Sequence, residues 1–348
     1  MNSTRKRIKI NSMPVTLKDI AKKCKVSFST VSKALKNSPE IGIETINLVK
    51  ETAKEMGYQP NLAARVLRTN RTFDIGVVFE DATGSGLQHQ YFAEIFDAVN
   101  VEANKKGYSI TFLNSERKTS SYLEQANSRH FDGIILVSTD FSRYDVQELL
   151  KSKIPVSMLD YDGDFPNSCA VFSDNYDGMK SLVDFIISKG HRKIAFIHGE
   201  NTEVTRKRIE AYKAALKEAK IPFNDDYLVE GQFHGTKASE EATEKLFALS
   251  EKPTCIIYPD DFAYLGGQRA LLSRNLVPGK DISTAGYDGI LLSSLLTPPL
   301  TTYSQDAKKL GTGLLDSLVD IIEGKKDGKA KPLKIAGKLC AGESVIKI

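Results

Sequence analysis

The stretch from Pro14 to Arg68 most constrains the fold, because three short helical patterns follow one another there with tight turns between them. The first pattern begins at Thr16, and Asp19 stands three residues later, which is the spacing of a capping box. Apolar side chains then recur at helical spacing along one face, namely Leu17, Ile20, Ala21 and Cys24. The stretch is therefore predicted to form a small all-α unit.

The second pattern, about 28–36, follows Ser27 as its cap and turns Val31 and Leu35 inward. Its opposite face carries hydroxyls, two cations and an aromatic ring, with no acid: Phe28, Ser29, Ser32, Lys33 and Lys36. A helix that enters the major groove of DNA needs these donors and cations. A small helical bundle with a solvated charged face fits the same pattern. The third pattern, about 43–56, ends at Gly57 and buries its apolar positions, Ile46, Val49, Ala53 and Met56.

Two segments, VTLKDIAKKCKVSFSTVSKAL and GYQPNLAARVLR, closely resemble the headpiece and hinge of the LacI/GalR family of bacterial transcription repressors. The resemblance implies a helix-turn-helix DNA-binding domain. It implies phosphate-contacting or positioning roles for Thr16, Leu17, Ser27, Thr30 and Asn61. It also implies base reading by Phe28, Ser29 and Lys33, supported by Ser32 and Lys36.

The chain departs from the family pattern at four positions of this unit. Ser29 is shorter than the amide common at that reader position, and Lys33 replaces an arginine, losing its bidentate fork. Gly42 stands where a serine usually caps the third helix, and Ile46 stands where an arginine is usual. The operator half-site is therefore expected to differ from those of relatives.

The hinge segment PNLAARVLR is short, and Asn61 can cap a helix of about eight residues there. A helix of that length is unstable alone in water, so we expect it to form only on DNA. By the resemblance, Leu67 enters the minor groove and Arg68 belongs to the same DNA-binding hinge. An ordinary core role for Leu67 is the alternative.

Charge is distributed unevenly along the chain. Residues 1–71 carry fifteen Lys/Arg and five Asp/Glu, a net +10, so that the remainder is −6 within a total of +4. A basic end on a mildly acidic body indicates a protein that presents one end to a polyanion. The basic N-terminal extension, 1–13, is either an arm on the DNA backbone or the product of an upstream start, because Met13 begins a complete family N-terminus.

Nothing in the sequence predicts export or membrane insertion. There is no signal-peptide pattern and no apolar run near the ~20 residues that a membrane span needs. The four cysteines lie far apart, which is typical of a reducing, cytoplasmic setting: Cys24, Cys169, Cys255 and Cys340.

From Asp74 onward, apolar runs alternate with amphipathic helical patterns, and the alternation restarts near residue 175. This predicts an α/β body of two doubly wound parallel-sheet subdomains with a ligand cleft between their strand ends. The body resembles the periplasmic-binding-protein-like effector domain of the same family, which implies chain crossings near Phe172, Tyr303 and Lys334. The expected organisation is a headpiece over 14–59, a hinge over 60–72, and an effector-binding and dimerisation domain over 73–348, with an N-subdomain of about 73–172 and 304–334 and a C-subdomain of about 173–303 and 335–348.

Polar groups at predicted strand ends mark the effector site. The resemblance implies pocket roles for Arg208, Asp288, Asp260, Asp261 and Phe233. A guanidinium and carboxylates can hold adjacent sugar hydroxyls, and an aromatic face can cover the ring. Asp260 departs from the asparagine often found there, and an ion pair of purely structural role is the alternative for Arg208 and Asp288. Two further candidates are Asp160, at the cleft rim, and Phe92, which fits plain core equally well.

No constellation for catalysis, metal or cofactor binding is found in the sequence. The chain is thus interpreted as a repressor and not as an enzyme. It is expected to bind a pseudopalindromic operator as a homodimer, because no heptad segment follows the last body strand, and to sense a sugar or sugar phosphate. A family regulator switched by a partner protein or by a nucleobase is the alternative, and a binding protein or enzyme on the same body is a more distant one.

Overall fold

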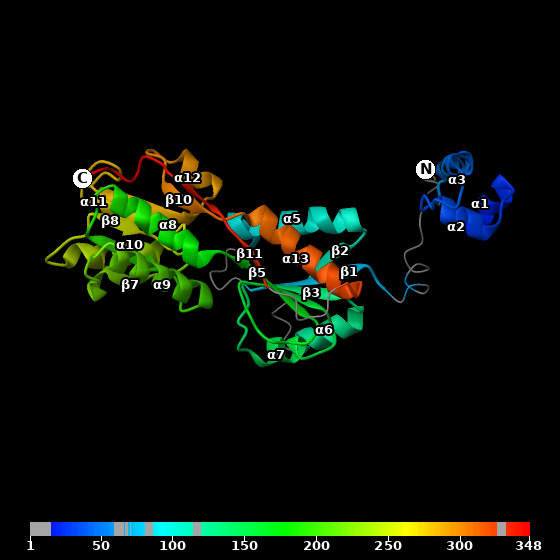
Figure 1. Cartoon of the computed structure of the whole chain (residues 1–348), viewed down its shortest axis with the longest axis horizontal. Coiled ribbons are helices and arrows are strands. Elements are labelled where there is room, and N and C mark those ends of the chain that lie inside the picture. The colour runs from blue at the N-terminus through cyan, green and yellow to red at the C-terminus, as the bar shows by residue number, and fades with distance from the viewer. Residues whose placement is uncertain are drawn as a thin grey trace, which may run out of the picture. The chain divides into compact units, whose positions relative to one another are not determined.

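A computed structural model describes residues 15–58, 66, 69, 71–80, 86–113, 120–325 and 332–348. The chain divides into two compact units, Met1–Asn70 and Arg71–Ile348 (Figure 1). The N-terminal extension and the hinge positions Asn61, Leu67 and Arg68 lie outside the described residues. In the part of the chain that is described, no helix combines the length and the apolar character that crossing a bilayer requires.

The first unit is a bundle of three helices, as its periodicity predicts: α1 (Leu17–Cys24), α2 (Phe28–Ala34) and α3 (Ile43–Glu55). Its centre is made of fully buried aliphatic side chains, among them Ile20, Val31 and Val49. Helix α2 ends two residues earlier than expected, since the backbone turns into the left-handed region at Asn37. Because α2 ends early, the segment that follows it folds back across the last turn of the helix.

The body contains two six-stranded sheets. The first has the order β11-β5-β4-β3-β1-β2, and all its strands are parallel. These strands are β1 (Asp74–Phe79), β2 (Ser109–Phe112), β3 (Gly133–Val137), β4 (Val156–Leu159), β5 (Ser168–Ser173) and β11 (Leu333–Ile335). Strands β3 and β4 are buried along their whole length, which explains why their sequences show no alternation.

The second sheet has the order β12-β10-β9-β8-β6-β7. Its strands are β6 (Ile194–His198), β7 (Leu228–Glu230), β8 (Cys255–Ile257), β9 (Ser283–Asp288), β10 (Thr301–Ser304) and β12 (Lys338–Cys340). The predicted parallel-sheet architecture is confirmed for both subdomains, and in this sheet the edge strand β12 alone among the described strands pairs antiparallel, with β10. The chain leaves the second sheet after β10 and returns to it through β12, by way of residues 336–337, so these two neighbouring strands run in opposite directions.

Helices cover both faces of each sheet (Figure 1). On the first sheet, α5 (Gln90–Lys106) and α13 (Ala307–Ile322) cover one face, and α6 (Tyr122–Arg129) and α7 (Tyr144–Leu150) cover the other. Helices α5 and α13 touch at Gly311, where an added Cβ would lie 2.3 Å from the carbonyl oxygen of Ile95. Glycine is therefore required at that contact.

On the second sheet, α8 (Asn175–Ser188) and α9 (Glu203–Glu218) cover one face, and α10 (Thr236–Ala248) and α11 (Tyr264–Ser273) cover the other. The short elements η1 (Gly86–Gln88), η2 (Asp225–Tyr227) and α12 (Leu291–Leu295) lie in the connections. We call the first sheet with its helices the first subdomain, and the second sheet with its helices the second subdomain.

The chain passes between the subdomains after β5, after β10 and after β11. Two of these passages lie in direct contact: the backbone N–H of Gly337 donates to the Tyr303 hydroxyl at 2.9 Å. Several strands of the two sheets end beside polar residues, namely Asp160 after β4, Asp260 after β8, Asp288 in β9 and Gln305 after β10. Such carboxyl ends are where doubly wound sheets bind ligands.

Candidate functional site

The start of α2 forms a hydroxyl-rich exposed surface on the first unit. Ser27 caps the helix, and its Oγ accepts a hydrogen bond from the Thr30 backbone N–H at 3.0 Å. The same Oγ lies 2.7 Å from Ser29 Oγ and 2.8 Å from Thr30 Oγ1. Phe28 beside them is 50% exposed although it is apolar. Donors, acceptors and an uncovered ring thus gather at the helix N-terminus, which suits base edges and phosphates.

Lys33, the third expected base reader, forms an ion pair with Glu40. The helical pattern alone does not reveal this acid, because Glu40 lies in the turn after α2 and not on the helix. Both side chains are exposed, and exposed ion pairs contribute little free energy. DNA can therefore compete for the Lys33 ammonium, while Lys36 is exposed in the turn that follows α2.

Thr16 begins α1 with the predicted capping box. The backbone N–H of Thr16 donates to Asp19 Oδ2 at 2.8 Å, and Thr16 Oγ1 accepts from the Asp19 backbone N–H at 3.4 Å. The Thr16 hydroxyl, which donates to Asp19 Oδ2 at 2.7 Å, and the Thr16 backbone N–H hold the pKa of Asp19 below its ordinary value. Leu17 is half-buried against the core of the unit, and Ser32 is half-buried as well. The exposed end of α1 can thus face a phosphate while its first apolar residue anchors the helix.

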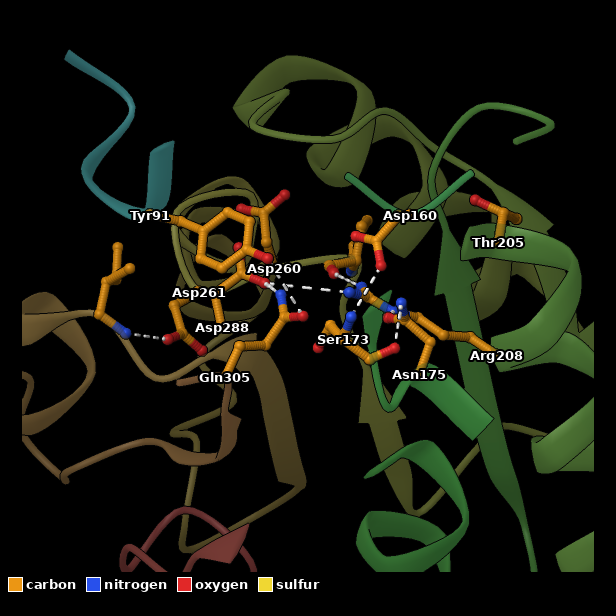
Figure 2. A network of polar contacts seen from close by, with 12 residues as sticks. Tyr91, Asp160, Ser173, Asn175, Thr205, Arg208, Asp260, Asp261, Asp288 and Gln305 are labelled. Carbon is orange, nitrogen blue, oxygen red and sulfur yellow. Dashed lines mark hydrogen bonds and ion pairs between the residues drawn. The ribbon is translucent and has the colours of Figure 1, made fainter. Parts of the chain in front are cut away.

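In the body, Arg208 of α9 is the centre of a buried polar cluster (Figure 2). Its Nε donates to Asn175 Oδ1 at 2.9 Å, and its Nη1 donates to the carbonyl oxygen of Pro259 at 3.0 Å. The guanidinium lies over the Tyr287 ring, 3.6 Å from its centroid, and 5.7 Å from that of Phe233. The second subdomain alone therefore positions this cation.

Asp288 lies opposite Arg208 at the end of β9, where its φ of 95° is in the left-handed region. Its Oδ1 is 3.9 Å from Arg208 Nη2, which is an ion pair but too long for a hydrogen bond. The same oxygen accepts from Gln305 Nε2 at 2.6 Å, and Gln305 Oε1 accepts from the Tyr91 hydroxyl at 3.4 Å. Burial raises the pKa of Asp288 above its ordinary value, and the attraction to Arg208 opposes this.

Two residues of the first subdomain complete the cluster. Asp160 follows β4 with a positive φ of 54°, and its Oδ1 accepts from the Ser173 backbone N–H at 2.8 Å. Loss of hydration raises the pKa of Asp160 to about 7. Tyr91 of α5 is buried, and desolvation together with the carboxylates of Asp160 and Asp288 raises its pKa well above the ordinary value. Figure 2 shows these side chains converging from both subdomains.

Asp260 and Asp261 are held by backbone amides. Asp260 accepts from three N–H groups, those of His234 at 2.6 Å, Ala263 at 2.7 Å and Phe262 at 3.0 Å. Asp261 is fully buried, and its Oδ2 accepts from the Ile290 backbone N–H at 2.9 Å. Their carboxylates therefore organise loops beside the cluster.

The two aromatic candidates lie in different surroundings. Phe233 is half-buried, and its ring lies where a side chain at Gly199 would stand, 2.3 Å from the added Cβ. Phe92 packs against Phe79 and His89, with ring centroids at 5.0 and 4.7 Å, and belongs to the core of the first subdomain. The structure thus places the Phe233 ring near Arg208, whereas the Phe92 ring packs against other rings of the first subdomain.

Three cluster residues were missed in the sequence: Tyr91, Asn175 and Gln305. Gln305 follows β10 directly, so the rule that selected Asp160 and Asp260 at strand ends also selects Gln305. Asn175 starts α8 immediately after a passage between subdomains. Tyr91 and Phe92 are neighbours on α5, and their side chains leave different faces of the helix. Tyr91 contacts Gln305 of the cluster, and Phe92 packs against Phe79.

Comparison with known proteins agrees with both units. The model of "Bacterial regulatory proteins, lacI family" matches residues 16–61, and the model of "Periplasmic binding protein-like domain" matches residues 183–345. The chain is 30% identical to the HTH-type transcriptional repressor PurR of Mannheimia succiniciproducens, over 96% of this chain and 99% of that protein. It is 32% identical to the probable HTH-type transcriptional repressor ExuR of Bacillus subtilis, over 90% and 94%.

Solved structures show the same architecture. The lac repressor dimer bound to operator and the anti-inducer ONPF superposes with a TM-score of 0.75 at 25% identity, covering 96% of this chain and all of that chain. A LacI family transcriptional regulator from Enterococcus faecium with bound ribose gives 0.68 at 25% identity, covering 79% and 99%. From the two matched models and the nearly full-length relatives it follows that this chain belongs to the lacI family of bacterial regulatory proteins, as a DNA-binding transcription regulator.

Proposed function

We propose that the protein represses transcription as a homodimer on a pseudopalindromic operator, in the cytoplasm, and that a neutral sugar bound at the Arg208 cluster controls operator affinity. The observation that carries the effector proposal is the 3.9 Å separation between Arg208 Nη2 and Asp288 Oδ1. A donor and an acceptor held at that distance are suited to one bridging hydroxyl, which accepts from the guanidinium and donates to the carboxylate.

The charge of the cluster favours a neutral effector. Asp160 and Asp288 face one guanidinium, and Asp260 and Asp261 lie beside them. A phosphate or carboxylate ligand would meet these carboxylates and find Arg208 already engaged by Asn175 and Pro259. Hydroxyl groups can donate to carboxylates and accept from Arg208 without that repulsion. We therefore narrow the expected effector from sugars and sugar phosphates to uncharged sugars.

The DNA-binding proposal is supported by the exposed N-terminal half of α2 and by the +10 charge of residues 1–71. Each headpiece presents one recognition helix, so two copies are needed to read the two halves of a pseudopalindrome. A relative of known structure is a dimer bound to operator, and another holds ribose, which agrees with both parts of the proposal.

Operator titration of the full-length protein with uncharged sugars, sugar phosphates, uronates and nucleobases tests the proposal. Uncharged sugars, such as ribose and cellobiose, are expected to shift fluorescence anisotropy on a labelled operator, and the charged compounds are not. Arg208→Met should remove the shift. Lys207→Met is the matched control, because Lys207 lies on the same helix, is exposed and pairs only with Glu210 at 3.4 Å among the described contacts.

A shift produced by phosphorylated sugars alone would contradict the neutral-ligand reasoning. A shift by nucleobases alone would replace the sugar by a planar heterocycle, and retention of the response in Arg208→Met would show that the effector binds elsewhere.

A further inference from the structure

Three stacked rings join the two subdomains beside the Arg208 cluster. His89 precedes α5 in the first subdomain, and its ring stacks on His234 of the second, with centroids 4.2 Å apart and planes 24° apart. His234 in turn stacks on Phe262, with centroids 3.9 Å apart and planes 9° apart. The three rings form a continuous column, in which His89 belongs to the first subdomain and His234 and Phe262 belong to the second. Phe262 also packs against the hydrophobic core of the first subdomain.

Asp260 fixes the half of the column that belongs to the second subdomain. Its two carboxylate oxygens accept from the backbone amides of both His234 and Phe262, the residues whose rings lie parallel. An asparagine offers only one acceptor oxygen and would set its NH2 group against an amide donor. The aspartate at this position is thus explained by the positions of two rings, which makes Asp260 a positioning residue for the column.

The other half of the column is tied to the effector cluster through α5. His89 is 6% exposed and also packs on Phe92 at 4.7 Å, yet its side chain makes no capping hydrogen bond to α5. Two residues later on the same helix, Tyr91 donates to Gln305 of the Asp288 network. The column and the effector cluster are therefore attached to one rigid helix, and separation of the subdomains would break both.

We infer that the His89–His234–Phe262 column is a closing latch between the subdomains, which holds the arrangement that binds the effector. Stacked rings contribute a modest attraction, so the latch can open and close reversibly. A latch that raises the fraction of closed molecules raises the apparent affinity for any ligand that needs the closed form. This inference rests on the proposed effector site, but the latch itself acts before any ligand is present.

The chain has no tryptophan, which allows a direct test. Phe262→Trp in the full-length protein places a single indole in the column, where its emission reports contact with His234. In this background and without ligand, His89→Ala is expected to shift the emission to the red and to increase quenching by acrylamide. His89→Phe should retain the emission of the parent, since a phenyl ring can restore the stack. Gln88→Ala, an exposed neighbour in η1, is the control.

Asp260→Asn is a second variant, which keeps the test decisive if the His89→Ala protein folds poorly. It should produce the same red shift, because it disturbs the hydrogen bonds from the backbone N–H groups of His234 and Phe262. Unchanged emission in both variants would overturn the latch.

Ribose or cellobiose, whichever shifts operator binding, should bind His89→Ala about two- to tenfold more weakly and His89→Phe normally. Weaker ligand binding with unchanged ligand-free emission would mean that His89 is a ligand contact and not a latch. A ligand-free red shift with no sugar response at all would leave the latch standing and would refute the proposed effector.

Discussion

Replacing Arg208 by alanine should weaken the body substantially while leaving operator binding intact. The change removes charge-assisted hydrogen bonds to Asn175 and Pro259 and the stacking on Tyr287, and the site is 4% exposed. Hydrogen bonds to charged groups contribute about 1.5–3 kcal/mol each. Removal of the arginine also relieves its own cost of burial, so truncating one member of such a network costs about 2–5 kcal/mol in all.

Urea unfolding followed by far-ultraviolet circular dichroism measures this loss, with Lys207→Ala as the control. Lys207 is exposed on the same helix, and its replacement should change the free energy of unfolding by less than about 0.5 kcal/mol. Arg208→Lys should fall between the two, because lysine keeps the charge and loses the fork that reaches two acceptors.

Operator affinity of Arg208→Ala should equal that of wild type at temperatures where the body is folded, because α2 belongs to the other compact unit. A free energy of unfolding within about 0.5 kcal/mol of wild type would refute the structural contribution assigned to these bonds. Loss of operator affinity in a fully folded variant would refute the separation of roles between the two units.

Three further predictions concern DNA and pH. Operator affinity should fall with salt by about 0.9 log units per phosphate contact per decade, measured by anisotropy, and an affinity that ignores salt would exclude phosphate binding by the basic unit. Leu67→Ala should weaken operator binding far more than binding to a scrambled duplex, because a minor-groove wedge acts only at the bent specific site, and equal losses would return Leu67 to a packing role. Asp160 has a pKa of about 7 in the folded protein against 3.8 ordinarily, so its contribution to stability is fully present below pH 3.8 and is lost as pH rises through 7. Urea unfolding should therefore show Asp160→Asn gaining stability relative to wild type between about pH 4 and 7, and a constant difference would contradict the raised pKa.

Local chemistry explains why the first unit could be predicted almost completely. The capping box of Thr16, the cap at Ser27 and the stop at Gly57 act within a few residues of chain, and the apolar period then determines the buried face. The end of α2 and the Lys33–Glu40 ion pair were missed, since both depend on how the following turn folds back. Apolar runs predicted the central strands of both sheets in the same way.

The short edge strands β11 and β12 escaped prediction, because three residues carry too little pattern and are recruited by neighbours already in place. The antiparallel direction of β12 likewise follows from the passage between the sheets and not from its own residues.

At the candidate site, the sequence by itself was enough to select Arg208 and Asp288 as the oppositely charged pair. Both stand in segments whose pattern and likeness to relatives point to ligand binding. Only the tertiary structure decided what surrounds them. It brought Tyr91 and Gln305 to Asp288, and it turned Asp260 toward three backbone amides. These contacts join residues up to 214 positions apart in the chain, and side chains so distant meet only after hydrophobic burial has packed the helices and sheets together.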